Sequence, residues 1–411
     1  MDGGAHEMIR ARPERIRTLM LIQSFRPNIG GGELQLERLL PYLAERGIHS
    51  EVLTRAFPGT RRREPISGGT IVRTALAGES PLASIVYVVQ SLTRTARRRR
   101  SVDVVHAHGA LSPGTIALGA RALGLPCITT VFSTGVRGDL TRLERKPMGR
   151  VRLRGLLRHS WFIALSDEVK QELESRGVSS SRILRIPNGV DCRNTFRPAS
   201  PVERGQLRAR LEIPQDAYAC IYVGRLHPKK RVDTLVQAVT RVPEARLLVV
   251  GDGTERAKLE ALTRRSGAAN RVTFVGFTHQ VADYLRACDV FVFPSKDEGM
   301  SNALIEAMAC GLPCVATAGV GGVRELLSDG RGIVVGRGYP AEWSTAIHRL
   351  AVDASLRESM GKAAARFAES ALSLDAVADS LLHAYQHVIR ADAGPGQHAR
   401  GPGDRRPEPL G

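Results

Sequence analysis

The chain has 411 residues, of which 43% are hydrophobic and 24% are charged, and its formal net charge is +18. These proportions exclude global disorder, and the length is enough for two or three domains. No run approaches the ~18 apolar residues of a membrane-spanning helix, and the N-terminus lacks the apolar core of a signal peptide. The six cysteines form no zinc-binding spacing and suit buried thiols in a reducing compartment. We therefore expect a cytoplasmic protein.

The excess positive charge is nearly all arginine and is unevenly spread. Arg61–Arg63 and Arg97–Arg100 form two runs, and basic residues dominate the stretch 137–158. Such patches attract phosphate, on a lipid headgroup or on a nucleic acid, although they can also be solvated surface. No aromatic residues interleave with the arginines to stack on bases, so we expect no nucleic-acid partner. The stretch 137–158 is the candidate contact with an anionic membrane, which would place the protein on the inner face of the cell membrane.

Short apolar runs alternate with amphipathic stretches along the whole chain, as is typical of parallel α/β architecture. In the first half we predict strands at Arg17–Phe25, Ser50–Arg55, Thr70–Thr74, Val102–His108, Cys127–Phe132, Trp161–Leu165 and Ile183–Ile186. In the second half we predict strands at Ala219–Val223, Leu247–Val250, Val272–Val275, Val290–Phe293, Cys314–Thr317 and Gly332–Val335.

A segment rich in Pro, Asn and Gly at 187–205 separates the two halves and predicts a domain boundary. Two doubly wound domains would direct the carboxyl ends of their strands toward a shared cleft. The predicted units are a flexible N-terminus at 1–15, Rossmann-like domains at 16–190 and 191–372, a C-terminal helix at 373–390, and a disordered tail at 391–411.

The most informative motif follows the predicted strand that ends at Phe293. Ser301 or Asn302 suits the N-cap of the next helix, which would leave the N–H groups of Asn302 and Ala303 free to bind phosphate. Glu298 precedes the helix and Glu306 lies about one turn inside it. On one continuous helix, eight residues would separate the two by roughly 12 Å, more than the ~5–9.5 Å between the carboxyl groups of a glycosidase. We therefore predict two hydrogen-bond acceptors for one extended ligand.

A second motif follows the predicted strand at Ala219–Val223. After Gly224, Arg225 and Lys230 lie on the loop and at the start of the next helix. Arginine offers a planar fork and lysine a compact charge, so the pair suits a diphosphate, although helix starts often carry such charges without binding anything.

Two further features lie in the first half. Gly30, Gly31 and Gly32 form a loop before a helix that we expect to begin at Glu33, and Gln35 excludes a dinucleotide-binding fingerprint. His106 and His108 end a buried strand, and without a third ligand nearby they are weak support for a metal site.

Taken together, these motifs resemble the retaining nucleotide-sugar glycosyltransferases of family 4, which have the two-domain GT-B fold. The resemblance covers about residues 17–390. The matching elements are the E-x7-E spacing of Glu298 and Glu306, Gly321-Gly322 with Glu325, Arg225 with Lys230, Gly30-Gly31 with Glu33, the interdomain PNGVD at 187–191, and His108. The helix after Leu374 resembles the family's final helix, which crosses back to the N-terminal domain.

The resemblance implies a hexosyltransferase that uses a UDP- or GDP-sugar and retains the anomeric configuration by same-face substitution. It implies catalytic roles for Glu298, His108, Arg225 and Lys230. The implied donor-binding residues are Gly30, Gly31, Arg225, Lys230, Ser301, Asn302, Ala303 and Glu306. No Asp has another Asp two positions away, so we expect no metal and no cofactor.

The acceptor is open at this stage. It could be a lipid-linked or envelope glycan, in polysaccharide or glycolipid biosynthesis, or a soluble small molecule such as an antibiotic core. The alternative to a glycosyltransferase is an epimerase or a phosphorylase of the same fold.

Overall fold

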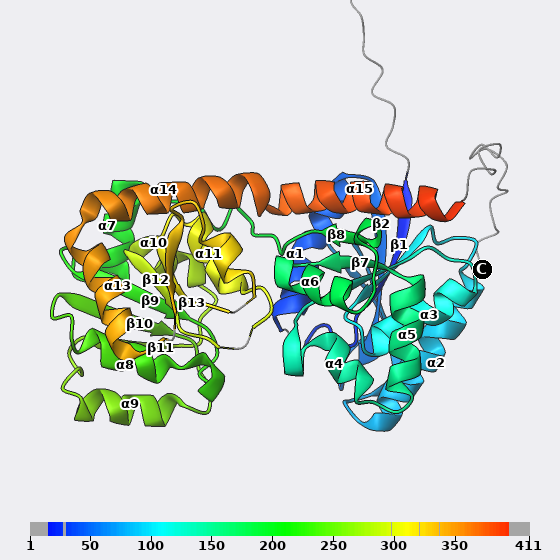
Figure 1. Cartoon of the computed structure of the whole chain (residues 1–411), viewed down its shortest axis with the longest axis horizontal. Helices are drawn as coiled ribbons and strands as arrows, with labels where there is room; N and C mark the ends of the chain where they lie inside the picture. The colour runs from blue at the N-terminus through cyan, green and yellow to red at the C-terminus, as the bar shows by residue number, and fades with distance from the viewer. Residues whose placement is uncertain (1–14, 28–29, 297, 320, 337, 394–411) are drawn as a thin grey trace, which may run out of the picture.

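The computed structural model describes residues 15–27, 30–296, 298–319, 321–336 and 338–393 (Figure 1). Two lobes lie side by side, and each consists of a mainly parallel sheet with helices packed around it (Figure 1). The α/β class and the GT-B-like arrangement of two doubly wound units are therefore confirmed.

The first sheet has the order β3-β4-β2-β1-β5-β6-β7-β8, in which only β3 runs antiparallel to its neighbour. Its strands are β1 Ile16–Leu21, β2 Ile48–Ala56, β3 Arg63–Ile66, β4 Gly69–Ala77, β5 Val104–His108, β6 Cys127–Val131, β7 Trp161–Ala164 and β8 Ile183–Arg185. Its helices are α1 Gly31–Glu45, α2 Pro81–Arg97, α3 Ser112–Ala122, α4 Asp139–Glu144, α5 Gly149–His159 and α6 Asp167–Ser175. The central strand β6 is buried at every position, as expected for a sheet covered on both faces.

The second sheet has the order β11-β10-β9-β12-β13-β14 and is parallel throughout its described ladders. Its strands are β9 Tyr218–Val223, β10 Ala245–Val250, β11 Val272–Gly276, β12 Val290–Phe293, β13 Cys314–Thr317 and β14 Gly332–Val335. Its helices are α7 Pro201–Arg210, α8 Val232–Val239, α9 Arg256–Arg265, α10 Val281–Ala287, α11 Asn302–Ala309, α12 Val323–Leu326 and α13 Pro340–Val352.

Helices α14 (Ala354–Ala371) and α15 (Leu374–Ala393) run one after the other along both lobes (Figure 1). The chain passes between the lobes twice, and the two passages lie side by side. The Val190 N–H donates to the Leu372 carbonyl at 2.7 Å, and the Leu374 N–H donates to the Val190 carbonyl at 3.0 Å. These bonds hold the two connections together at one place.

The structure changes several predicted boundaries. Strand β3 was not predicted, because Arg63–Ile66 contains no apolar run. The strand lies at the edge of the sheet, where it pairs with β4 alone and needs no continuous apolar segment. Strand β1 ends at Leu21 rather than Phe25, and helix α1 begins at Gly31 rather than Glu33.

Helix α15 extends past the predicted start of the tail. Residues 391–393 belong to it, and Asp392 forms an ion pair with Arg121 at 2.7 Å, which gives this last turn a tertiary contact. The remainder of the predicted flexible ends, 1–14 and 394–411, lies outside the described residues. Within the described part of the chain, no helix is long and apolar enough to cross a membrane.

Candidate active site

A cleft of about 960 Å³ opens between the lobes, at the carboxyl ends of strands from both sheets. This is the place where parallel α/β sheets bind their ligands. The first lobe contributes Gly31 and His108, and the second contributes Arg225, Lys230 and Glu298, so the fold brings separate sequence motifs to one cavity. Among the described lining residues there are five basic and three acidic side chains, an excess that suits an anionic ligand.

Arg225 and Lys230 follow strand β9 and lie in the cleft as predicted. Arg225 is exposed, and no carboxylate among the described residues pairs with it. Lys230 forms an ion pair with Glu298, whose Oε1 also accepts a hydrogen bond of 3.0 Å from the Ser295 hydroxyl. The site therefore holds Glu298 in a fixed position and leaves the Arg225 guanidinium available to an anion.

Helix α11 begins at the cleft with the predicted cap, since the Ser301 Oγ accepts the Leu304 N–H at 3.4 Å. Residues Asn302 and Ala303 line the cleft, and N–H groups in the first turn of a helix have no carbonyl partner within the helix. The Asn302 side chain, however, joins the lobes, because its Nδ2 donates to the Gly31 carbonyl at 3.0 Å. Asn188, in the interdomain segment, donates to Asn302 Oδ1 at 2.9 Å.

The structure separates Glu306 from the other predicted residues. Its carboxylate is buried and forms a 2.6 Å ion pair with Arg38 of helix α1, and it does not line the cleft. Burial raises the pKa of Glu306, and the charge of Arg38 offsets part of that shift. No local pattern in the sequence predicted this pair, which joins helix α11 of the second lobe to helix α1 of the first.

The glycine motifs bring backbones close together. The Gly30 N–H donates to Glu33 Oε2 at 3.1 Å, so Gly30 caps α1, while Gly31 lines the cleft. A Cβ on Gly299 would lie 2.1 Å from the Phe132 carbonyl oxygen, and one on Gly321 would lie 1.4 Å from the Gly299 carbonyl oxygen. Glycine at 299 lets the loop after β12 approach the first lobe, and glycine at 321 lets the loop after β13 pack against that same loop.

His108 ends strand β5 at the cleft, with its ring stacked on His106 at a centroid distance of 4.2 Å. Burial lowers the pKa of His108 to about 4, so the ring is neutral at pH 7. Its Nε2 is buried and, within the described residues, has no hydrogen-bond partner. His106 is held by Tyr385 of α15 at Nδ1 and by Thr130 at Nε2, both at 2.7 Å. Helix α15 thus helps to hold the ring of His106, on which the ring of His108 stacks.

Several residues of the cleft were not identified as site residues from the sequence, and four of them are charged or amide side chains that can contact a ligand. Arg55 is buried on β2, and Asp139 is buried with its Oδ2 accepting the Phe132 N–H at 2.9 Å. Arg142 and Asn188 also line the cleft. Arg142 had been assigned to the outer basic stretch. Arg55 could have been identified from the sequence, because it is a basic residue at the carboxyl end of a predicted strand. No group of three or more His, Cys, Asp or Glu in the described residues could hold a metal ion.

Comparison with known proteins gives the family. The model of "Glycosyltransferase Family 4" matches residues 29–194, and that of "Glycosyl transferases group 1" matches residues 203–367. The chain is 31% identical over 429 aligned residues to D-inositol 3-phosphate glycosyltransferase of Geodermatophilus obscurus, covering 95% of this chain and 93% of that protein.

Two solved structures share the fold. Sucrose-phosphate synthase from Thermosynechococcus elongatus superposes with a TM-score of 0.77 at 24% identity, covering 92% of this chain and 100% of that one. Anabaena HepE in complex with UDP-glucose superposes with a TM-score of 0.73 at 22% identity, covering 90% of this chain and 100% of that one.

The two-lobed arrangement with its interlobe cleft is the GT-B fold. The chain belongs to glycosyltransferase family 4, and it is an enzyme that transfers glycosyl groups.

Proposed function

We propose that the enzyme transfers a hexose-type sugar from a UDP-sugar to an acceptor hydroxyl, with retention at the anomeric carbon. The observation that carries the proposal is the cleft itself, in which Arg225, Lys230 and the first turn of α11 lie opposite His108. UDP is our first choice over GDP because HepE, which has the same fold, has been solved with UDP-glucose.

In the proposed reaction the bond from the anomeric carbon to the diphosphate oxygen breaks, and a bond to the acceptor oxygen forms on the same face. The acceptor proton passes to an oxygen of the leaving diphosphate. Arg225, Lys230 and the N–H groups of α11 stabilise the charge that grows on that group. Glu298 accepts hydrogen bonds from sugar hydroxyls. Neutral His108, with its unpaired Nε2, contacts the sugar near the reacting carbon.

For the acceptor, we propose a small polyol that carries a phosphate group. The relative that is 31% identical is named a D-inositol 3-phosphate glycosyltransferase. The first lobe also places Arg55 and Arg142 in the cleft, where a guanidinium suits an acceptor phosphate.

The test is UDP release from UDP-glucose, UDP-N-acetylglucosamine and GDP-mannose, with D-inositol 3-phosphate or unphosphorylated inositol as acceptor. UDP release only when acceptor is present supports transfer and excludes an epimerase. Arg142→Gln should raise the KM for the phosphorylated acceptor about tenfold, whereas Arg145→Gln, an exposed neighbour outside the cleft, should not. Equal KM values for the two variants would contradict the acceptor assignment.

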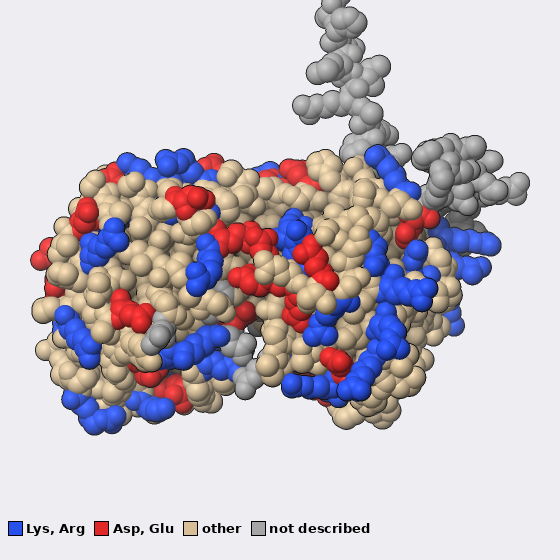
Figure 2. Space-filling view, viewed as in Figure 1, with Lys and Arg blue, Asp and Glu red and all other residues tan. Residues whose placement is uncertain are grey.

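The second candidate acceptor is a lipid-linked or envelope glycan at an anionic membrane. Helix α5 supports it, because Val151 is 62% exposed and Arg150 and Arg154 also face solvent. Arg152 of the same stretch instead turns inward and hydrogen-bonds Thr115, so only part of 137–158 is available to a surface. Basic side chains also line the outer edge of the first lobe (Figure 2).

Arg150→Gln with Arg154→Gln should release the enzyme from phosphatidylglycerol vesicles if the membrane candidate is correct, since each arginine contributes about 1 kcal/mol at an anionic surface. The pair Arg264→Gln and Arg265→Gln, exposed on α9 of the other lobe, is the matched control. In either case we propose a cytoplasmic reaction, which the six free cysteines favour.

A further inference from the structure

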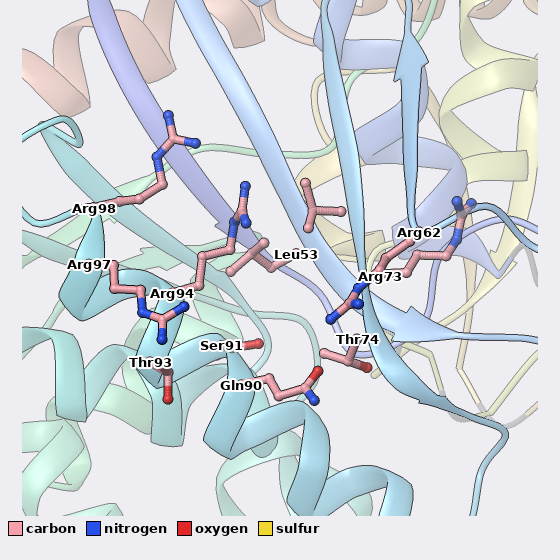
Figure 3. Close-up of a pocket in the computed structure, with 11 residues that line it drawn as sticks. Leu53, Arg62, Arg73, Thr74, Gln90, Ser91, Thr93, Arg94, Arg97 and Arg98 are labelled. Atoms are coloured by element: carbon pink, nitrogen blue, oxygen red, sulfur yellow. The ribbon is translucent and has the colours of Figure 1, made fainter. Parts of the chain in front are cut away.

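The two arginine runs of the first lobe meet at one pocket that the proposed reaction does not use. The cavity has a volume of about 420 Å³ and lies between helix α2 and strands β2 and β4. Arg97 reaches it from α2, and Arg62 reaches it from the segment before β3, on the opposite side (Figure 3). None of its lining residues lines the interlobe cleft.

One acidic residue fixes part of the pocket wall. Glu51 of β2 binds Arg94 through two hydrogen bonds of 2.7 and 2.9 Å and binds Arg98 at 3.1 Å. Burial would raise the pKa of Glu51, but its bonds and charge interactions with these arginines hold it below the ordinary value. Glu51 therefore remains ionised and holds two guanidinium groups in place.

Of the other arginines that line the pocket, Arg73 is paired with Glu64 at 2.7 Å, but two are not neutralised. Arg62 and Arg97 are exposed, and neither forms an ion pair with any carboxylate of the described residues. Two buried hydroxyl groups line the same cavity, those of Ser91, which is 2% exposed, and Thr74, which is 8% exposed. Both hydroxyl oxygens lack a hydrogen-bond partner among the described residues. Buried polar atoms without partners are unusual, and here they lie beside two unpaired cations.

We propose that this pocket is a second, non-catalytic anion site that binds a phosphate group. Arg62 and Arg97 supply charge-assisted hydrogen bonds, and the hydroxyl groups of Thr74 and Ser91 donate to further phosphate oxygens. Phosphate fits because it offers several acceptor oxygens to a planar guanidinium fork. The site does not depend on which donor or acceptor the cleft takes.

The phosphate can come from a soluble molecule or from a lipid headgroup. Helix α2 gives a reason to test the second source. Ile85 and Val89 are 60% and 56% exposed. Residues four positions apart share a face of a helix, so these two lie in one row on α2, and the same row continues through Thr93 to Arg97. An exposed apolar row that leads into a basic pocket is the pattern of a helix lying at a membrane surface.

The experiment measures binding of two probes with the cleft saturated by UDP. Pyrophosphate is followed by its effect on the melting temperature, and phosphatidylglycerol vesicles are followed by sedimentation, with phosphatidylcholine vesicles as the neutral control. The variant Arg62→Gln with Arg97→Gln is compared with Arg264→Gln and Arg265→Gln, which removes the same charge from the other lobe.

The pocket variant should weaken binding of one probe or both by roughly 25-fold, at about fivefold for each arginine, while the control pair stays near wild type. The probe whose binding is weakened identifies the source of the phosphate. Thr74→Val, which keeps both shape and charge, should weaken the same probe by roughly two- to tenfold. Equal binding by the two arginine pairs would overturn the proposal, and so would a Thr74→Val protein that binds both probes as wild type does.

Discussion

Glu298 and Glu306 belong to the same sequence motif but have different surroundings, and a paired substitution tests whether their functions differ as well. Glu298 lines the cleft and pairs with Lys230, whereas Glu306 is buried against Arg38. The family resemblance implies that Glu306 accepts hydrogen bonds from the donor ribose, although its carboxylate does not line the cleft in this structure. Such bonds are the same in the ground and transition states, so on that role Glu306→Gln should raise the donor KM more than it lowers kcat. We expect Glu298→Gln to lower kcat, because charge develops on the sugar that it contacts.

The magnitude follows from the charge that each carboxylate loses. A hydrogen bond to a charged group contributes roughly 1.5–3 kcal/mol, so each variant should change its parameter by about one to two decades. Glutamine keeps the size of the side chain and one acceptor oxygen. Arg38 can therefore still donate to residue 306, and the unfolding free energy should fall by roughly 1–2 kcal/mol, less than the 3–5 kcal/mol for removing one partner of a buried pair.

The assay is steady-state UDP release with the donor varied at saturating acceptor, together with the melting temperature of each variant. Arg38→Gln serves as the comparison, since it breaks the same ion pair from the other lobe. If Glu306→Gln and Arg38→Gln both lowered the melting temperature and left the donor KM unchanged, Glu306 would be an interlobe contact without a donor role. The assigned roles would be reversed if Glu306→Gln lowered kcat while Glu298→Gln changed only the donor KM.

Four further outcomes are expected. Arg225→Ala should lower kcat by ~10² to 10³, the usual loss for one group that stabilises developing charge, and turnover within threefold of wild type would contradict the diphosphate assignment. Chelation by EDTA should leave turnover unchanged, which checks the predicted metal independence. Because burial depresses the pKa of His108 from 6.5 to about 4, its stabilising contribution is present above pH 6.5 and is lost as the pH falls toward 4. That shift corresponds to about 3 kcal/mol, so acid unfolding should begin at lower pH in His108→Gln, and an unchanged acid midpoint would argue against it. Tyr385→Phe removes a hydrogen bond to His106 and should lower kcat severalfold with little change in donor KM, whereas a fall in melting temperature alone would mean a structural role only.

Local sequence patterns determined most of the fold and most of the candidate site. Apolar runs predicted the thirteen described strands that pair in parallel, β4 among them, because a buried parallel strand needs a continuous apolar segment. Only the antiparallel edge strand β3 was missed among the described strands. Arg225, Glu298 and His108 were placed near the cleft because each lies at or just after the end of a predicted strand, and the carboxyl ends of parallel strands lie at one edge of a sheet. The cap at Ser301 is likewise local, since it depends on a side chain and an N–H group three residues apart.

Only the tertiary structure decided the contacts between distant residues. Arg38 and Glu306 are 268 positions apart, and their pairing depends on how the two lobes are placed, which no local periodicity encodes. The same holds for the pocket that brings Arg62 to Arg97, and for Tyr385, which reaches His106 because α15 returns to the first lobe. Spacing along the chain predicts which face of an element a residue occupies, but the partner across that face depends on the packing of whole elements.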